Sequence, residues 1–490
     1  MKKLFVCLLA LLMLVPLLVA CNSDKDVSSE SSETSEFVIT TPVKDLEGRE
    51  IYVLCWDFGA TAASIMGYTG EIIYDEENPT SVDVAKKLVV DNIESTYNCK
   101  IVGEMISTGS IPNTIRNQVT SGIHYYDIVF DSISSSAPLA ADHMLTDLTT
   151  VSTIDLEDAW WDQNAVKDFS IGSRVYFACG DINNYDDQGT WCMLFNKTLK
   201  EKLAIEEDFY QLARDKEWTF DKFVEICKNG ITTNSNGDDV LDEKDTWAFG
   251  TELYNIYVHL VGAGETIARK DDDDLPYLTV LSEPEATYSV LTKVLEFYND
   301  GETVMIANAS PYKDKGFNNM WEETVHKAFI EGRELFYMCG LINVASFRQM
   351  EDEFGILPIP MFYENQDSYH HTVSRGNSTV MYIPRNATNV EDLGLAITAI
   401  AEQSKHFVTP AYYDVQLKYR DSRDDESGEM LDIIFASRSF DIGMVYNWGG
   451  ILECFYDLNP GTVTSRFEAI SGSAQTAMNN MILAFEEDDK

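Results

Sequence analysis

Strand-like and helix-like segments alternate along the first part of this 490-residue chain, and this alternation restricts the fold more than any other feature. Residues 51–55, 100–105 and 126–130 are short apolar runs of the kind that form buried strands. Between them, residues 82–93 and 111–119 carry apolar side chains at helical spacing. Strands that alternate with helices predict an α/β fold, in which parallel sheets are covered by helices on both faces.

Ligands of such sheets bind in crevices beyond the carboxyl ends of the strands. The loops that we expect at such crevices are residues 56–58, 131–134, 341–343 and 374–377. Their polar candidates for ligand contact are Asp57, Asp131, Ser132, Asn343, Arg375 and Asn377. A structural ion pair would explain Arg375 equally well.

The N-terminus has the order of a secretory signal: two lysines, an apolar run over residues 4–18, and small residues. Cys21 follows the small residue, as in bacterial lipoproteins, so we expect residues 1–20 to be a signal peptide and Cys21 to be lipidated. Residues 21–36 are acidic and polar, which predicts an unfolded leash. An ordinary signal with an incidental cysteine and a single membrane helix are the alternatives. The lipid would hold the exported protein at the outer face of the cytoplasmic membrane, on the cell surface.

Composition excludes some partners. The net charge of −45 argues against nucleic acid, because phosphate binding requires clustered Lys and Arg, and it argues against an anionic lipid surface. The only membrane contact that we expect is the lipid anchor.

Seven cysteines follow Cys21, and none has the close spacing of a zinc or redox site. They are interpreted as small buried side chains. A disulfide framework is the alternative, and Cys179 with Cys192 is then the candidate pair.

Several segments resemble, in order, bacterial extracellular solute-binding proteins of family 1, the sugar-binding components of ABC importers. They are residues 194–197, 217–221, 332–337, 354–360 and 382–384. The resemblance implies a two-lobe periplasmic-binding-protein-like fold with a hinge between the lobes. The first lobe would comprise residues 37–182 and 361–410, and the second residues 183–360 and 411–490.

The resemblance also implies a function. The protein would be a non-enzymatic solute-binding lipoprotein that captures a small solute, a carbohydrate, and delivers it to the permease subunits of an ABC importer. A surface sensor or adhesin with the same fold is an alternative, and so is a secreted glycoside hydrolase. No spacing of carboxylates, however, selects a catalytic pair.

Sugar rings pack on aromatic side chains, which makes aromatic residues beside polar turns candidates for the binding site. The candidates of this kind are Trp56, Tyr185, Tyr446 and Trp448, and Trp191 belongs to the same class. Trp448 is the first choice, because residues 446–450 form an aromatic loop that ends in two glycines. Each of these rings could instead belong to the core.

Residues 234–245 resemble a twelve-residue calcium loop, although no cofactor is required for the expected function. The expected ligands of this structural Ca²⁺ occupy alternate positions: Asn234, Asn236, Asp238, Val240, Asp242 and Asp245. The loop departs from the pattern at Asn234, at Asp239 in place of glycine, and at Asp245 in place of glutamate. The alternative is an acidic turn without metal.

Overall fold

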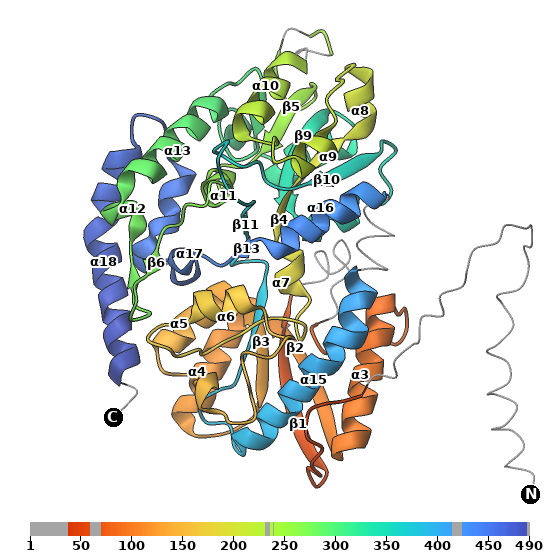
Figure 1. Cartoon of the computed structure of the whole chain (residues 1–490), viewed down its shortest axis with the longest axis vertical. Coiled ribbons are helices and arrows are strands. Elements are labelled where there is room, and N and C mark those ends of the chain that lie inside the picture. Colours follow the sequence, from red (N-terminus) through yellow and green to blue (C-terminus); the bar gives the residue numbers. More distant parts are fainter. Residues whose placement is uncertain (1–37, 59–69, 231–235, 239, 414–423, 488–490) are drawn as a thin grey trace, which may run out of the picture. The chain divides into compact units, whose positions relative to one another are not determined.

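The computed structural model describes residues 38–58, 70–230, 236–238, 240–413 and 424–487. From Ile39 onward the chain is one compact unit that contains two main sheets. We call the part built on the first sheet the first lobe and the part built on the second sheet the second lobe (Figure 1).

The first sheet has the strand order β12-β3-β1-β2. Its strands are β1 (Arg49–Asp57), β2 (Cys99–Ser107), β3 (Ile128–Ser132) and β12 (Thr379–Tyr382). β1 pairs in parallel with β2 and β3, whereas β12 is antiparallel to β3. The three strands predicted from sequence are therefore confirmed, with each boundary correct to within two residues.

Alternate residues of β1 serve opposite faces of this sheet, as the two-residue period of a strand requires. Val53 and Cys55 join a core cluster with α3 (Ser81–Tyr97), and Leu54 joins another with α4 (Ile111–Ser121). α3 begins after Thr80, whose side chain forms a capping box with Asp83. Helices thus cover both faces of the sheet, as the alternation predicted.

The second sheet has the order β10-β4-β9-β5-β8. Its strands are β4 (Trp191–Asn196), β5 (Trp247–Thr251), β8 (Val304–Ile306), β9 (Glu334–Gly340) and β10 (Phe354–Leu357). β5 is parallel to β8 and β9, but β4 is antiparallel to β9 and β10. The prediction of parallel strands therefore fails for β4, which alone runs against the other four strands of this sheet, and for β12 in the first sheet. Consecutive strands of a sheet are parallel when a helical crossover joins them. β4 and β12 are not reached by such a crossover, because the chain enters the sheet at each of them from another part of the fold.

The other helices surround these sheets (Figure 1). In the first half of the chain they are α5 (Ile133–Ala141), α6 (Gln163–Phe169), α7 (Tyr185–Gln188), α8 (Lys197–Lys202), α9 (Phe209–Arg214) and α10 (Phe220–Gly230). In the second half they are α11 (Asn255–Gly262), α12 (Thr279–Ser282), α13 (Pro284–Tyr298), α14 (Lys327–Ile330), α15 (Val390–Pro410), α16 (Asp425–Ala436), α17 (Ile442–Tyr446) and α18 (Val463–Glu487).

Short strands lie where the chain crosses between the lobes. β11 (His371–Thr372) pairs in parallel with β13 (Arg438–Ser439), and α7 lies beside them (Figure 1). A separate two-stranded ribbon is formed by β6 (Arg269–Lys270) and β7 (Pro276–Tyr277). The C-terminal helix α18 contacts α5 of the first lobe and α12 and α13 of the second.

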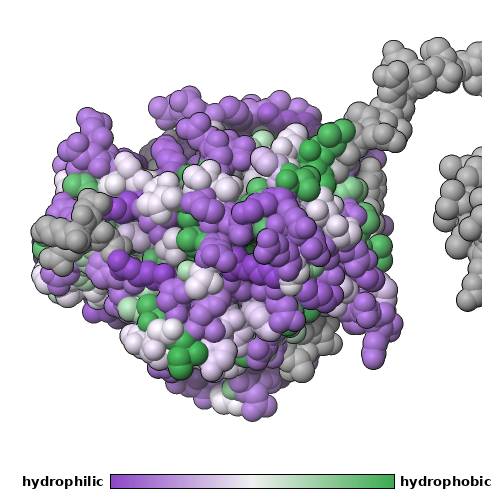
Figure 2. Space-filling view, turned by 90° about the horizontal axis from the view of Figure 1, so that it is seen from below, coloured by the Kyte–Doolittle hydropathy of each residue, from purple (hydrophilic) through white to green (hydrophobic). Residues whose placement is uncertain are grey.

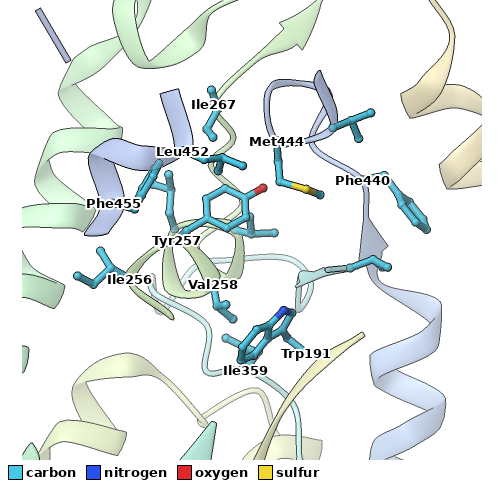
Figure 3. Packing of buried hydrophobic residues seen from close by; sticks show 14 of the residues in the cluster. Trp191, Ile256, Tyr257, Val258, Ile267, Ile359, Phe440, Met444, Leu452 and Phe455 are labelled. Carbon is cyan, nitrogen blue, oxygen red and sulfur yellow. The ribbon is translucent and has the colours of Figure 1, made fainter. Parts of the chain in front are cut away.

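The core of the second lobe is rich in aromatic side chains. Figure 3 shows Tyr257 of α11 among Ile267, Met444 and Leu452, with Trp191 at the margin of this cluster near Ile359. The face seen from below is, in contrast, largely hydrophilic, and its hydrophobic residues form small separate groups (Figure 2). Among the helices of the described residues, none has the length and hydropathy needed to span a membrane.

The seven cysteines after Cys21 are all free and buried in the structure. This agrees with their interpretation as small core side chains. Cys192 lies opposite Cys339 in the pairing of β4 with β9, and it forms no bridge with the candidate partner Cys179. Cys21 itself lies outside the described residues.

Candidate functional site

Two adjoining cavities, of about 410 and 230 Å³, lie between the segments that follow the strands of the two sheets. They share Trp191, Glu252, Ser374 and Asn377, so we treat them as one cleft. The further lining residues of the larger cavity include Ser134, Tyr254, Asn308, Arg375, Glu453 and Tyr456. Those of the smaller one include Trp321, Met338, Cys339, Ile342 and Asn343.

The cleft lies at the carboxyl ends of the strands, as expected for an α/β sheet. Glu252 directly follows β5, Asn308 follows β8, and Asn343 follows β9. Ser134 follows β3 of the other sheet. Both lobes therefore contribute polar side chains to one cleft.

Three aromatic rings form a row along the larger cavity. The ring centroids of Trp191 and Tyr254 are 5.9 Å apart, and those of Tyr254 and Tyr456 are 6.0 Å apart. Tyr456 is 47% exposed, whereas Trp191 is 9% exposed. The Trp191 indole nitrogen is buried and has no hydrogen-bond partner among the described residues. Such a row offers flat apolar faces together with polar edges.

Glu252 is the most unusual group in the cleft. Its carboxylate makes no hydrogen bond or ion pair with any residue that the structure describes. Burial raises the pKa of the Glu252 carboxyl to about 7, because the charged form loses its hydration. Glu252 is half-buried, and a carboxylate that has lost part of its hydration without gaining a partner is costly, so a ligand that satisfies it would gain binding energy.

Arg375 brings the opposite charge to the same cleft. Its Nε atom is buried, and the guanidinium makes no ion pair within the described part of the chain. Burial lowers the pKa of Arg375, while the neighbouring groups Tyr254 and Glu453 act in the opposite direction. A guanidinium offers five donors, so it can hold several acceptors of one ligand.

Three of the ten predicted ligand-binding residues line this cleft: Asn343, Arg375 and Asn377. The structure does not bring Asp131 and Ser132 to it. The Oδ1 atom of Asp131 accepts a hydrogen bond from the Ser132 amide at 2.8 Å, and Ser132 caps α5 through the Ser135 amide at 3.2 Å. Both residues are buried and position the start of α5.

Trp56 and Tyr185 form a second aromatic group outside the cleft. The Trp56 ring stacks on Phe58 with centroids 3.5 Å apart, and Phe58 lies 5.0 Å from Tyr185. Trp56 and Tyr185 are 7% and 2% exposed, and neither lines the two cavities. Asp57, at the end of β1, is half-buried and lines neither cavity.

Tyr446 and Trp448 lie in the core beside α18, away from the cleft. Their rings stack with an interplanar angle of 8°, and the Trp448 indole donates to the Met481 sulfur at 3.4 Å. Trp448 is only 3% exposed. Gly449 has φ +62°, and a Cβ there would lie 2.6 Å from the backbone nitrogen of Ala474. Gly449 therefore allows close packing on α18, and the buried Trp448 ring packs in the core, which corrects our interpretation of this segment as a binding loop.

Other cleft residues were not selected from sequence, namely Glu252, Tyr254, Asn308 and Tyr456. A signal existed for two of them, because Glu252 and Tyr254 directly follow the residues of β5, which have the apolar composition of a buried strand. Tyr456 had no such signal, since it reaches the cleft only through the packing of the helical segment Trp448–Tyr456.

The predicted calcium loop uses its carboxylates within the fold. Asp245 accepts a hydrogen bond from the Asp242 amide at 2.9 Å, and Asp242 accepts one from the Lys244 amide at 2.9 Å. The Lys315 ammonium lies 3.7 Å from Asp242. Among the described residues no group of three or more His, Cys, Asp or Glu is arranged to hold a metal. Asn234 lies outside those residues, so the calcium site stays a prediction.

Comparisons with known proteins place this fold. No protein-family model matches the chain, and no curated protein sequence matches it. Many solved structures do match. The ABC substrate-binding protein Lmo0181 from Listeria monocytogenes, in complex with cycloalternan, is 12% identical with a TM-score of 0.54, over 87% of this chain and 99% of that one.

Two further structures show the same similarity. The cyclic alpha-maltosyl-1,6-maltose binding protein from Arthrobacter globiformis is 13% identical with a TM-score of 0.55, over 89% of this chain and 98% of that one. A family 1 extracellular solute-binding protein from Bifidobacterium longum subsp. infantis is 13% identical with a TM-score of 0.51, over 90% and 100% of the two chains. The resemblance seen in the sequence is thus confirmed at the level of the fold, and this chain has the two-lobe α/β fold of the extracellular solute-binding proteins.

Proposed function

We propose that this protein is an exported lipoprotein that captures a carbohydrate in the cleft between its lobes and delivers it to an ABC importer. The observation that carries the proposal is the cleft itself. Glu252, Arg375 and the Trp191 indole all lack partners within the described residues and line one cavity with a row of aromatic rings.

A carbohydrate satisfies each part of this arrangement. Its C–H faces pack on aromatic rings, and its hydroxyls both donate to carboxylates and accept from Arg or indole groups. The amides of Asn308, Asn343 and Asn377 add donors and acceptors around the same space. The similar structures support this reading, because one was solved with cycloalternan and another binds cyclic alpha-maltosyl-1,6-maltose.

The test is calorimetric titration of the mature protein with a panel of mono- and oligosaccharides. Tyr456→Ala removes a partly exposed ring of the cleft, so it should weaken the best ligand roughly tenfold without unfolding the protein. Tyr125→Ala is the matched control, because Tyr125 is 62% exposed on the first lobe and lines neither cavity. Equal affinities of the two variants would contradict the assignment of the binding site to this cleft.

The same titration separates the alternatives. Release of shorter sugars from an oligosaccharide would favour the glycoside hydrolase, whereas unchanged ligand after long incubation favours a binding protein. Binding without uptake of the same sugar by the cells that make this protein would favour a sensor or adhesin. Failure of every saccharide to bind would overturn the carbohydrate assignment.

Attachment at the membrane is a separate part of the proposal. Cys21 follows an apolar run and small residues, and a diacylglyceryl group there would supply two acyl chains, enough for stable anchoring. Cells that express Cys21→Ser should release the protein from the membrane fraction, while Cys7→Ser should not. A Cys21→Ser protein that stays in the membrane fraction as firmly as the original protein would contradict lipidation.

A further inference from the structure

The charges that line the cleft do not balance. Glu252 and Glu453 are its carboxylates, and Arg375 is its cation. Glu453 accepts a hydrogen bond from Asn447 at 3.2 Å and acts electrostatically on Arg375. Glu252 makes no ion pair with Arg375 or with any other cation of the described residues, and burial is what raises its pKa. The site therefore holds one uncompensated carboxylate where the two cavities meet.

Two kinds of ligand group could satisfy that carboxylate. A sugar hydroxyl would donate a hydrogen bond, but the negative charge of the half-buried carboxylate would remain. An ammonium group would donate hydrogen bonds and also neutralise the charge, which matters most where water is excluded. The rings of Trp191 and Tyr254 line the same cavity, and aromatic faces attract an ammonium group further.

The net charge of the whole chain also favours a positively charged ligand. With a net charge of −45, the protein attracts cations and repels anions over distances longer than a contact. An acidic sugar would meet this repulsion and would add a third carboxylate to a cleft with one guanidinium. A sugar that bears a protonated amino group is attracted both by the net charge of the chain and by the Glu252 carboxylate.

We propose that Glu252 makes this cleft selective for saccharides that carry a protonated amino group, so that the ligand class is an amino sugar. This inference rests on the proposed function, because it concerns the same cleft and assumes that a saccharide occupies it. It assigns to Glu252 the role of the specificity-determining residue.

The experiment uses pairs of sugars that differ only at nitrogen. Glucosamine and the chitosan di- and trisaccharides are compared with their N-acetylated forms, and glucosamine, galactosamine and mannosamine with their neutral parents, by calorimetry at pH 7. We expect at least one amine to bind at least tenfold more tightly than its uncharged partner. Glu252→Gln keeps the shape of the side chain and should abolish that preference.

Glu296→Gln is the matched control, because Glu296 is exposed on α13 and lines neither cavity. It should keep the preference of the original protein. If Glu252→Gln is poorly folded, the comparison of each amine with its N-acetyl form in the original protein decides alone. Tighter binding of the uncharged sugars would overturn the amino-sugar inference and leave the proposed function standing. Absence of binding by any sugar, charged or neutral, would overturn both.

Discussion

Arg438 of β13 donates a hydrogen bond from Nη1 to the Asp187 carboxylate of α7 at 2.6 Å, which joins two crossings of the chain between the lobes. The same guanidinium pairs with Asp186, at 3.3 Å, and with Asp162 at the start of α6. Arg438 and these aspartates are largely buried. One cation thus holds three carboxylates at the place where a hinge between the lobes would lie.

Loss of the Arg438 guanidinium should strongly destabilise the folded protein. We expect Arg438→Met to lower the free energy of unfolding by about 3–5 kcal/mol, because it leaves buried carboxylates unpaired. Arg214→Met is the control: Arg214 pairs with Glu426 and Glu429 at the surface, where such pairs contribute about 1 kcal/mol or less. Urea unfolding of both variants measures the difference. Equal losses would show that the Arg438 cluster adds little to stability.

Trp448 should matter for stability and not for binding. We expect Trp448→Ala to cost about 3–5 kcal/mol, because it empties a core site against α18. Its folded fraction should bind the best saccharide with unchanged affinity, in contrast to Tyr456→Ala. Thermal unfolding and titration of the two variants, side by side, check this. A weakened affinity at full folding would restore the original interpretation of Trp448 as a stacking residue.

The sequence was sufficient for the elements that local pattern determines. β1, α3 and α4 follow from apolar runs and apolar periodicity, and they form as predicted. Asn343 and Arg375 were found because a polar residue after a strand is a local signal. The pairing of Trp191 with Tyr254 and Tyr456 could not be found this way, because it joins three distant parts of the chain.

The same limit explains the misplaced residues. The local sequence around an aromatic residue beside a polar turn is the same whether its ring faces a ligand or packs on a neighbouring helix. For Trp448 the neighbour is α18, which begins at Val463. No local sequence pattern predicts where α18 packs on the fold. The antiparallel direction of β4 is likewise a property of how the chain enters the second lobe, and its residues do not encode it.

Calcium is expected to raise Tm, because oxygen atoms at alternate residues of the loop 234–245 can surround one cation. Asp238→Ala should remove the increase. Asp272→Ala, in the acidic run at residues 271–274, is the control and should keep it. Melting with calcium and with a chelator gives the comparison. An unchanged Tm would mean that backbone amides and Lys315 are the only partners these carboxylates need.

Stability should fall as pH rises toward and through neutrality, and Glu252 should account for part of this dependence. The pKa of its carboxyl is about 7 in the folded protein against an ordinary 4.5, so the folded state binds more protons than the unfolded state between these values. The free energy of unfolding therefore decreases as pH rises from about 4.5 to about 7, and it levels off above. The carboxyls of Asp168, Asp187 and Asp441, each with a pKa raised to about 6 chiefly by burial, act in the same direction.

Glu252→Gln cannot take up this proton, so its unfolding free energy, measured in urea from pH 5 to pH 8, should vary less steeply than that of the original protein. The remaining slope should persist, because the three aspartates are still present, and Glu296→Gln should leave the full slope intact. Identical slopes for Glu252→Gln and the original protein would show that Glu252 is solvated in the free cleft, and would remove the cost of burial on which its role as a ligand group depends.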